Sequence, residues 1–167
     1  MLVSGNGVMS ARVGWFILLA IAATVNGLLA GASLDQSIEQ LPARHRIGVR
    51  AYSAYSRASH LANGRFWLIP LGIGGALLTI AAAVWDWRLH LPNSLPVFLA
   101  GGLAIAHTLS TVKAGSINLT QWKVGDDDVA LADILQRFAW WQAVRASLQF
   151  LTFAVTIWAL AVNGPTG

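Results

Sequence analysis

Residues 13–34 read VGWFILLAIAATVNGLLAGASL, a stretch of 22 residues without a charged side chain. At 1.5 Å per residue, a helix of this length covers about 33 Å, enough to cross the roughly 30 Å hydrocarbon core of a bilayer. The apolar part is longer than the ~7 to 15 residues of a removable signal peptide. We therefore expect residues 13–34 to form a membrane-spanning helix.

Three further charge-free stretches follow, at residues 66–84, 95–112 and 146–162. The last two are close to the lower limit of about 17 residues for a spanning helix, so neighbouring residues must extend them. Of the 167 residues, 56% are hydrophobic and 11% are charged, against about 25% charged in a soluble domain. The sequence thus predicts an all-α integral membrane four-helix bundle, a single domain over residues 1–167 with spans at about 13–34, 61–84, 95–113 and 140–162.

The second span is expected to begin well before its apolar part. Residues 48–64 contain no proline and can continue the helix outward as a juxtamembrane extension. Pro70 should kink this helix, because its ring removes a backbone donor and clashes with the preceding turn. Gly72 and Ala76 form a small-xxx-small pair of the kind that lets helix backbones approach each other.

Composition excludes several classes of site. The chain has no cysteine, so disulfides, thiolate zinc sites, iron–sulfur clusters and cysteine nucleophiles are ruled out. The net charge is +4, but no run of Lys or Arg could follow a phosphate backbone, so nucleic acid is not an expected partner. The sequence has neither a His-x-x-x-His pair nor a Glu-x-x-His motif, so a metal site built from protein ligands alone is not expected.

Four spans place both termini on one side of the membrane and residues 35–60 and 113–133 on the other. Lys and Arg gather on the second side, which predicts a multi-pass protein of the bacterial inner membrane with the termini outside and the longer connections in the cytoplasm. The lipid bilayer is then the first partner, and the Gly-rich helix faces leave room for a homo-oligomer. The basic residues on the second side are Arg44, Arg46, Arg50, Arg57, Lys113 and Lys123.

Polar residues recur at helical spacing in each span, although a polar group that faces lipid costs several kcal/mol. Four such stripes predict a bundle with a polar interior. The alternative is that Ser and Thr bond back to the preceding helical turn. The stripes are Asn26, Ser33 and Ser37; Ser53, Ser56, Arg57, His60, Asn63 and Trp67; His107, Ser110, Thr111 and Asn118; and Gln142, Arg145, Gln149, Thr152 and Thr156.

Chain topology places the polar ends of the four stripes at a similar depth in the membrane. His60 is interpreted as a hydrogen-bonded interior histidine, an axial haem ligand or an acid–base group, since imidazole suits all three roles. His107 lies in an otherwise apolar span, where an ionisable residue indicates function. Nearby acids should pair with arginines, and a structural ion-pair set of Glu39, Arg44 and Arg57 is expected, with Asp35 or Glu39 also available to Arg145.

Three segments carry a family resemblance: SIEQLPARHRIGVRAYSAYSRASHLANG at 37–64, SINLTQW at 116–122 and RFAWWQAVRASL at 137–148. Together they resemble the anthrone-oxygenase-like family of small four-helix membrane proteins, most of which have no known function. Gln142 and Ser116 stand where the family commonly has His and Pro. The family's marks fall on Glu39, Pro42, Ala43, Arg44, Asn118, Trp140, Val144 and Arg145.

A second similarity is to styrene oxide isomerases, which are also small four-helix membrane proteins. The segment RASHLANG, with His60, Asn63 and Gly64, is similar to their histidine region when a gap is allowed. This similarity implies haem b with His60 as its ligand, the ferric iron acting as a Lewis acid on an epoxide oxygen. The expected cofactor is therefore either none or haem b.

The polar stripes and the family resemblance together give a functional hypothesis. The polar interior would bind a small hydrophobic or aromatic, anthrone-like compound, and the protein would be an oxidoreductase, a cofactor-independent monooxygenase. The rival hypotheses are a haem-dependent epoxide isomerase and a non-enzymatic membrane protein whose polar stripes only fix helix pairing. The candidate catalytic residues are His60, His107 and Arg145, and the candidate substrate-binding residues are Asn26, Asn63, Trp67, Asn118, Gln142 and Gln149.

Overall fold

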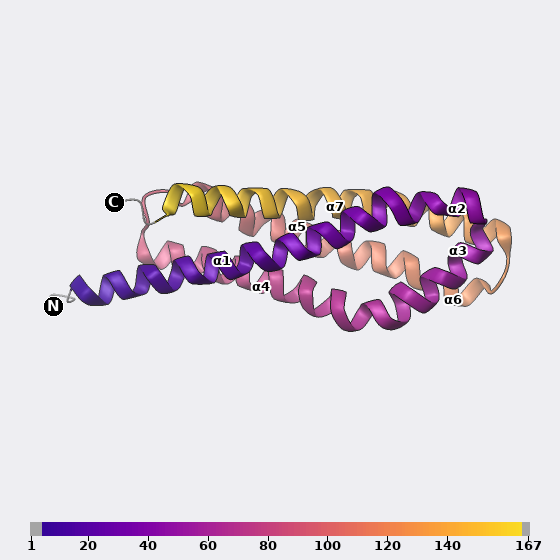
Figure 1. Cartoon of the computed structure of the whole chain (residues 1–167), viewed down its shortest axis with the longest axis horizontal. Helices are drawn as coiled ribbons and strands as arrows, with labels where there is room; N and C mark the ends of the chain where they lie inside the picture. Colours follow the sequence, from indigo (N-terminus) through magenta and orange to yellow (C-terminus); the bar gives the residue numbers. More distant parts are fainter. Residues whose placement is uncertain (1–4, 165–167) are drawn as a thin grey trace.

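A computed structural model describes residues 5–164, and this range is helical except for short connections. The long helices lie side by side in an elongated bundle (Figure 1). The predicted all-α four-helix bundle is confirmed over these residues. Its elements are α1 (Gly5–Asp35), η1 (Gln36–Gln40), α2 (Leu41–Ile47), α3 (Val49–Ser56), η2 (Arg57–Gly64), α4 (Arg65–Leu89), α5 (Leu95–Leu119), α6 (Gln121–Val124) and α7 (Asp128–Asn163).

Four helical runs are long and apolar enough to cross a membrane. They cover Met9–Ile47, Val49–Leu89, Leu95–Val124 and Asp128–Asn163 and contain 39, 41, 30 and 36 residues. A span needs only about 20 residues, so each run continues past the hydrocarbon core. The second run includes the juxtamembrane extension expected from the absence of proline between residues 48 and 64.

Around the bundle, α1 packs against α4 and α7, and α5 packs against α7 and α4. The start of α1 and the end of α7 lie at one end of the bundle, as four antiparallel spans require (Figure 1). The hairpin of α2 and α3 lies at the opposite end with α6. The second run bows away from the others where η2 passes into α4, near Pro70 in the second turn of α4.

Four exposed tryptophans form two pairs, one on α4 and one on α7, and Trp122 on α6 is exposed at the hairpin end. On α4, Trp67 and Trp87 are 75% and 67% exposed and are 20 residues apart, about 30 Å along the helix. On α7, Trp140 and Trp158 are exposed and are separated by about 27 Å. Trp favours the membrane–water interface, and these spacings match the thickness of the hydrocarbon core. We infer that the hairpin end of the bundle projects beyond the bilayer.

Close packing between α1 and α4 depends on small residues and two buried hydrogen bonds. The Trp15 indole donates to the backbone oxygen of Ala82 at 2.9 Å. Further along, Asn26 Nδ2 donates to Thr79 Oγ1 at 2.8 Å. A Cβ at Gly75 would lie 2.8 Å from Asn26 Oδ1, so a larger residue at this crossing would have to displace the Asn26 side chain. These contacts fix how α1 and α4 pair.

The reversal between α2 and α3 depends on one glycine. Gly48 has φ 87° and ψ 154°, a conformation that is essentially restricted to glycine. We expect Gly48→Ala to lower the stability of the folded protein by about 1–3 kcal/mol because Cβ strains this backbone. Thermal unfolding in detergent, followed by circular dichroism, measures the loss. Gly31→Ala is the control, since Gly31 is helical and a Cβ there meets open space; an equal loss in both variants would contradict this explanation.

Candidate functional site

Two π-helical segments lie where the first and second runs leave the bilayer region. In a π-helix the hydrogen bonds join residues i and i+5, which widens the turn, and such segments are frequent at functional sites. One is η1 in the first run and the other is η2 in the second run. A side-chain hydrogen bond links them, with 2.7 Å between His60 Nε2 and Gln40 Oε1.

Beside these segments lies a partly open cavity of about 690 Å³, within the usual range of about 300–1,000 Å³ for ligand sites. Most of its lining is apolar. The lining contains two arginines, two histidines and no carboxylate. It is formed by Leu29, Ala32, Ser33, Gln36, His60, Leu61, Gly64, Arg65, Leu68, Ile69, Gly72, Ile73, His107, Thr108, Thr111, Val112, Gly115, Ser116, Asn118, Leu119, Phe138, Arg145 and Gln149.

Arg145 on α7 is the central cation of this cavity. Its Nη2 donates to Gln36 Oε1 at 2.9 Å, and its Nε has no hydrogen-bond partner among the described residues. The neutral amide of Gln36 orients the guanidinium without neutralising it. An anionic or strongly polar oxygen in the cavity would therefore find unused hydrogen-bond donors at Arg145.

His107 on α5 is the deepest of the polar groups. Its side chain is only 1% exposed, and within residues 5–164 neither ring nitrogen has a hydrogen-bond partner. Gln149 on α7 is 3% exposed, and its Oε1 likewise lacks a partner in this part of the chain. Buried polar groups are nearly always satisfied, so several unsatisfied groups that line one cavity make it the candidate site.

His60 contributes a second imidazole from η2. Its Nδ1 is buried without a partner in the described chain, while Nε2 is bonded to Gln40. Haem b would need a ring nitrogen with room for the planar macrocycle. Nδ1 stands next to the backbone of its own residue, and the roomier Nε2 is engaged. In this conformation His60 does not fit an axial haem ligand.

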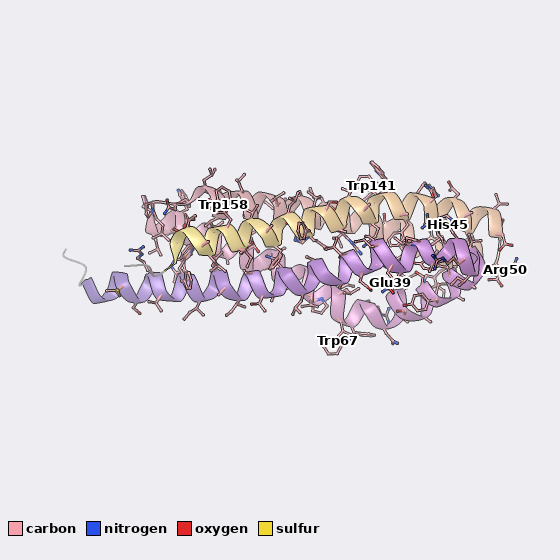
Figure 2. The ribbon with its side chains drawn as sticks, turned by 45° about the horizontal axis from the view of Figure 1, so that its top comes forward. Glu39, His45, Arg50, Trp67, Trp141 and Trp158 are labelled. Atoms are coloured by element: carbon pink, nitrogen blue, oxygen red, sulfur yellow. The ribbon has the colours of Figure 1, made fainter. Side chains whose placement is uncertain are left out.

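Two of the predicted substrate-binding residues lie outside the cavity. Trp67 is 75% exposed and points away from the other helices (Figure 2), and Asn63 is also exposed. Both were assigned to the interior stripe at a spacing of 3.6 residues per turn. The wider turns of η2 rotate the following residues, and Gly64 and Leu68 take the interior positions. The predicted interior placement of Trp67 and Asn63 is wrong for this reason.

The other predicted binding residues divide into two groups. Asn118 and Gln149 line the cavity, and Gln121 donates a side-chain hydrogen bond to Asn118 Oδ1. Asn26 and Gln142 are buried away from the lining and join helices instead. Asn26 bonds Thr79 on α4, and Gln142 Nε2 donates to the Ser33 backbone oxygen on α1 at 3.1 Å. Their amide nitrogens therefore serve helix pairing, while Asn26 Oδ1 and Gln142 Oε1 have no partner among the described residues.

Ion pairs at the hairpin end differ from the expected set. Arg57 pairs with Asp126 at 3.4 Å, and Arg50 pairs with Asp128 at 3.1 Å. Arg44 donates to the Leu41 backbone oxygen and to Gln136 Oε1.

Glu39, which Figure 2 labels on η1, is exposed and forms no ion pair with any residue in the described range. The expected pairing of Glu39 with Arg44 or Arg57 is wrong, because the turn before α7 brings Asp126 and Asp128 across to α3 and η2.

Gln36 and Gln40 hold Arg145 and His60 but are not among the residues predicted from the sequence. Helical spacing continues the first stripe from Ser33 to Ser37, whereas in the structure Gln36 is the buried residue. The available signal was the pair of glutamines that flanks a short polar segment directly after the span.

Across residues 5–164, no three His, Asp or Glu side chains gather as a metal site.

Comparison with protein families, with curated proteins and with solved structures finds no match for this chain.

His107 offers a test of whether the cavity's polar groups serve the fold. We expect His107→Leu to leave the stability unchanged or raised, because a similar volume replaces two unsatisfied nitrogens. Thr79→Val is the contrasting variant: it removes the acceptor of Asn26 Nδ2 with little change of shape and should cost about 1–3 kcal/mol. Thermal unfolding in one detergent compares both variants with the wild type. A large loss in His107→Leu would show that this histidine is structural.

Proposed function

We propose that this integral membrane protein binds a small apolar, oxygen-bearing compound in the cavity and acts on it by proton transfer. The observation that carries the proposal is the convergence of His60, His107 and Arg145, all with unsatisfied nitrogens, on one cavity with a mostly apolar lining. The apolar walls suit an aromatic or aliphatic body. The unsatisfied nitrogens suit a carbonyl or phenolic oxygen.

Each polar group has a chemical role in this scheme. A neutral imidazole can remove a proton from a carbon next to a carbonyl group, or from a phenol. The negative charge that develops on the oxygen is stabilised by a prepositioned cation in a site without bulk water. Arg145 supplies this cation, with Gln36 orienting it. His60 and His107 are the candidate bases, and Asn118 contributes further polar lining.

The resemblance to the anthrone-oxygenase-like family supports oxidation as the overall reaction. Removal of a proton from the methylene group of an anthrone-like compound gives an electron-rich phenolate. Dioxygen then accepts electrons from this anion, the methylene becomes a carbonyl, and one oxygen atom leaves as water. The chain's own task is to hold the oxygen of the anion and to move protons. Trp67 has no part in this scheme because it lies outside the cavity.

Helix pairing alone accounts for some of the polar stripes but not for those in the cavity. Asn26 and Gln142 each bond an atom on a neighbouring helix, as a purely structural role requires. His107 forms no such bond to any described residue. This difference favours a binding role for the cavity residues over the non-enzymatic hypothesis.

The excess of Lys and Arg at the hairpin end supports an orientation with this end in the cytoplasm and the termini outside. Arg44, Arg46, Arg50 and Lys123 all belong to that end. In a bacterial inner membrane the cavity would then lie at the cytoplasmic side of the bilayer. A homo-oligomer formed through exposed apolar helix faces is compatible with this arrangement.

We expect the purified protein to convert anthrone to anthraquinone in the presence of dioxygen, followed by absorbance. His107→Leu and Arg145→Gln should each lower the turnover by roughly 100-fold or more, since they remove a proton-transfer group and the oxygen-binding cation. His45→Ala is the control, because His45, labelled in Figure 2, is exposed on α2 and is not among the residues that line the cavity. Circular dichroism and size-exclusion chromatography establish that each variant is folded.

Full turnover in folded His107→Leu and Arg145→Gln would refute the proposed roles. An absorbance scan of the purified protein adds an independent check on the cofactor. A Soret band that disappears in His60→Ala would assign a haem to this histidine and replace the proposal by the isomerase hypothesis.

A further inference from the structure

We infer that the ligand enters the cavity sideways from the bilayer, through a slot between α4 and α5, and that it is an amphiphile with an acidic head group. This inference rests on the proposed ligand-binding function of the cavity. It adds the route of entry and the chemical class of the head group.

The slot is defined by residues that both line the cavity and are exposed. Ile69 and Ile73 on α4 are 55% and 54% exposed, and Val112 on α5 is 67% exposed. Between these side chains, Gly72 and Gly115 leave the lining open, since a Cβ at either position meets no atom within 4 Å. Leu119, Ser116 and Arg65 are also exposed residues of the lining. The opening is therefore rimmed mainly by apolar side chains, which suits contact with lipid chains.

The depth of the opening matches the way an amphiphile lies in a bilayer. Trp67, whose ring marks the interface, lies two residues before Ile69 and six before Ile73. The slot therefore opens just inside the hydrocarbon region. Arg145 lies five residues beyond the exposed Trp140 on α7, at a similar level. A molecule with its head at Arg145 and its tail among α4 and α5 would keep each part near its depth in the membrane.

Charge complementarity indicates the head group. The lining holds Arg145 and Arg65 and contains no Asp or Glu, and Arg145 meets only a neutral amide. A buried cation without a counter-ion is unfavourable near lipid, and an anionic oxygen would supply both the charge and the missing hydrogen-bond acceptor. A carboxylate or an acidic phenol on an apolar body has this chemistry. A neutral ester of the same body does not.

The test uses the full-length protein in phosphatidylcholine nanodiscs and a palmitate that carries a photoreactive diazirine in its chain. After illumination, mass spectrometry locates the labelled residues. Leu29 and His107 are the informative positions, because both line the cavity but are only 4% and 1% exposed. We expect the acid to label these positions at least about tenfold more than its methyl ester does, as loss of a charge-assisted hydrogen bond predicts.

Plugging the slot should remove this labelling. The double variant Gly72→Leu, Gly115→Leu places side chains in the open gap, and we expect a loss of roughly tenfold or more at Leu29 and His107. The matched control is Gly74→Leu, Gly102→Leu, on the same two helices but outside the lining, where a Cβ also meets open space. Arg145→Gln should lower labelling by the acid to the level of the ester.

Equal labelling by the acid and the ester would overturn the acidic head group. Undiminished labelling in the plugged variant would overturn the lateral route, and absence of label at both buried positions would overturn the inference as a whole. Failure of the proposed function is distinguishable from failure of this inference. If the cavity is labelled as expected but anthrone is not turned over, only the proposed reaction is contradicted. If the cavity is not labelled and anthrone turnover is unchanged in the plugged variant, only this inference is contradicted.

Discussion

The hydrocarbon core of a bilayer contains no water, so polar groups in a membrane bundle are best satisfied by other groups of the protein. Several buried polar residues meet this constraint across helix interfaces. Asn26, Thr79 and Gln142 bond a neighbouring helix, although Asn26 Oδ1 and Gln142 Oε1 have no partner among the described residues. Neither ring nitrogen of His107 has such a partner, and Gln149 Oε1 also lacks one. Unpartnered atoms occur outside the cavity too, at Tyr52, Ser56 and Asp86, so what distinguishes the site is that His60, His107, Arg145 and Gln149 line the same cavity.

The π-helical segments show how a local change in helix winding positions this site. A regular α-helix through η2 would continue the stripe that joins His60 to Asn63 and Trp67. The wider turns instead carry Gly64 and Leu68 to the interior and leave Trp67 at the surface, where it lies at the membrane interface. In the first run, Gln36 at the start of η1 is buried, whereas Ser37 is partly exposed. The wider turns of η2 thus remove a bulky ring from the cavity, and the partner of Arg145 comes from the end of the first span.

Much of the architecture could be predicted from hydropathy alone, because charge-free stretches near the length of a bilayer leave few alternatives to spanning helices. Residues 13–34 became part of α1, and the proline-free residues 48–64 became the extension of the second run. The convergence of His60, His107, Asn118 and Arg145 also followed from topology and helical spacing.

Predictions that required a particular helical phase or a contact distant in sequence were less successful. The displacement of Asn63 and Trp67 depends on π-helical winding, which leaves no periodic signal in the sequence. The pairing of Arg57 with Asp126 depends on how the turn before α7 folds back over η2, which spacing along the chain does not define. Small residues raise the same difficulty. Gly72 was expected to mediate packing, but Gly75 is the glycine at the α1–α4 crossing.

Gly75 lies in the packed crossing and Gly72 borders open space, and this difference bears on why the cavity exists. Close helix packing in a membrane is favourable, and a larger side chain at Gly72 or Gly115 would fill open space without a clash. A chain selected only for stability would gain by filling this gap and by replacing His107 with an apolar residue. We therefore expect the glycines at the opening and the unsatisfied imidazole inside to make the bundle less stable at two connected places. To enter from the bilayer, an acidic molecule would require an opening lined by apolar atoms. To bind, it would require a guanidinium without a counter-ion at the end of that opening.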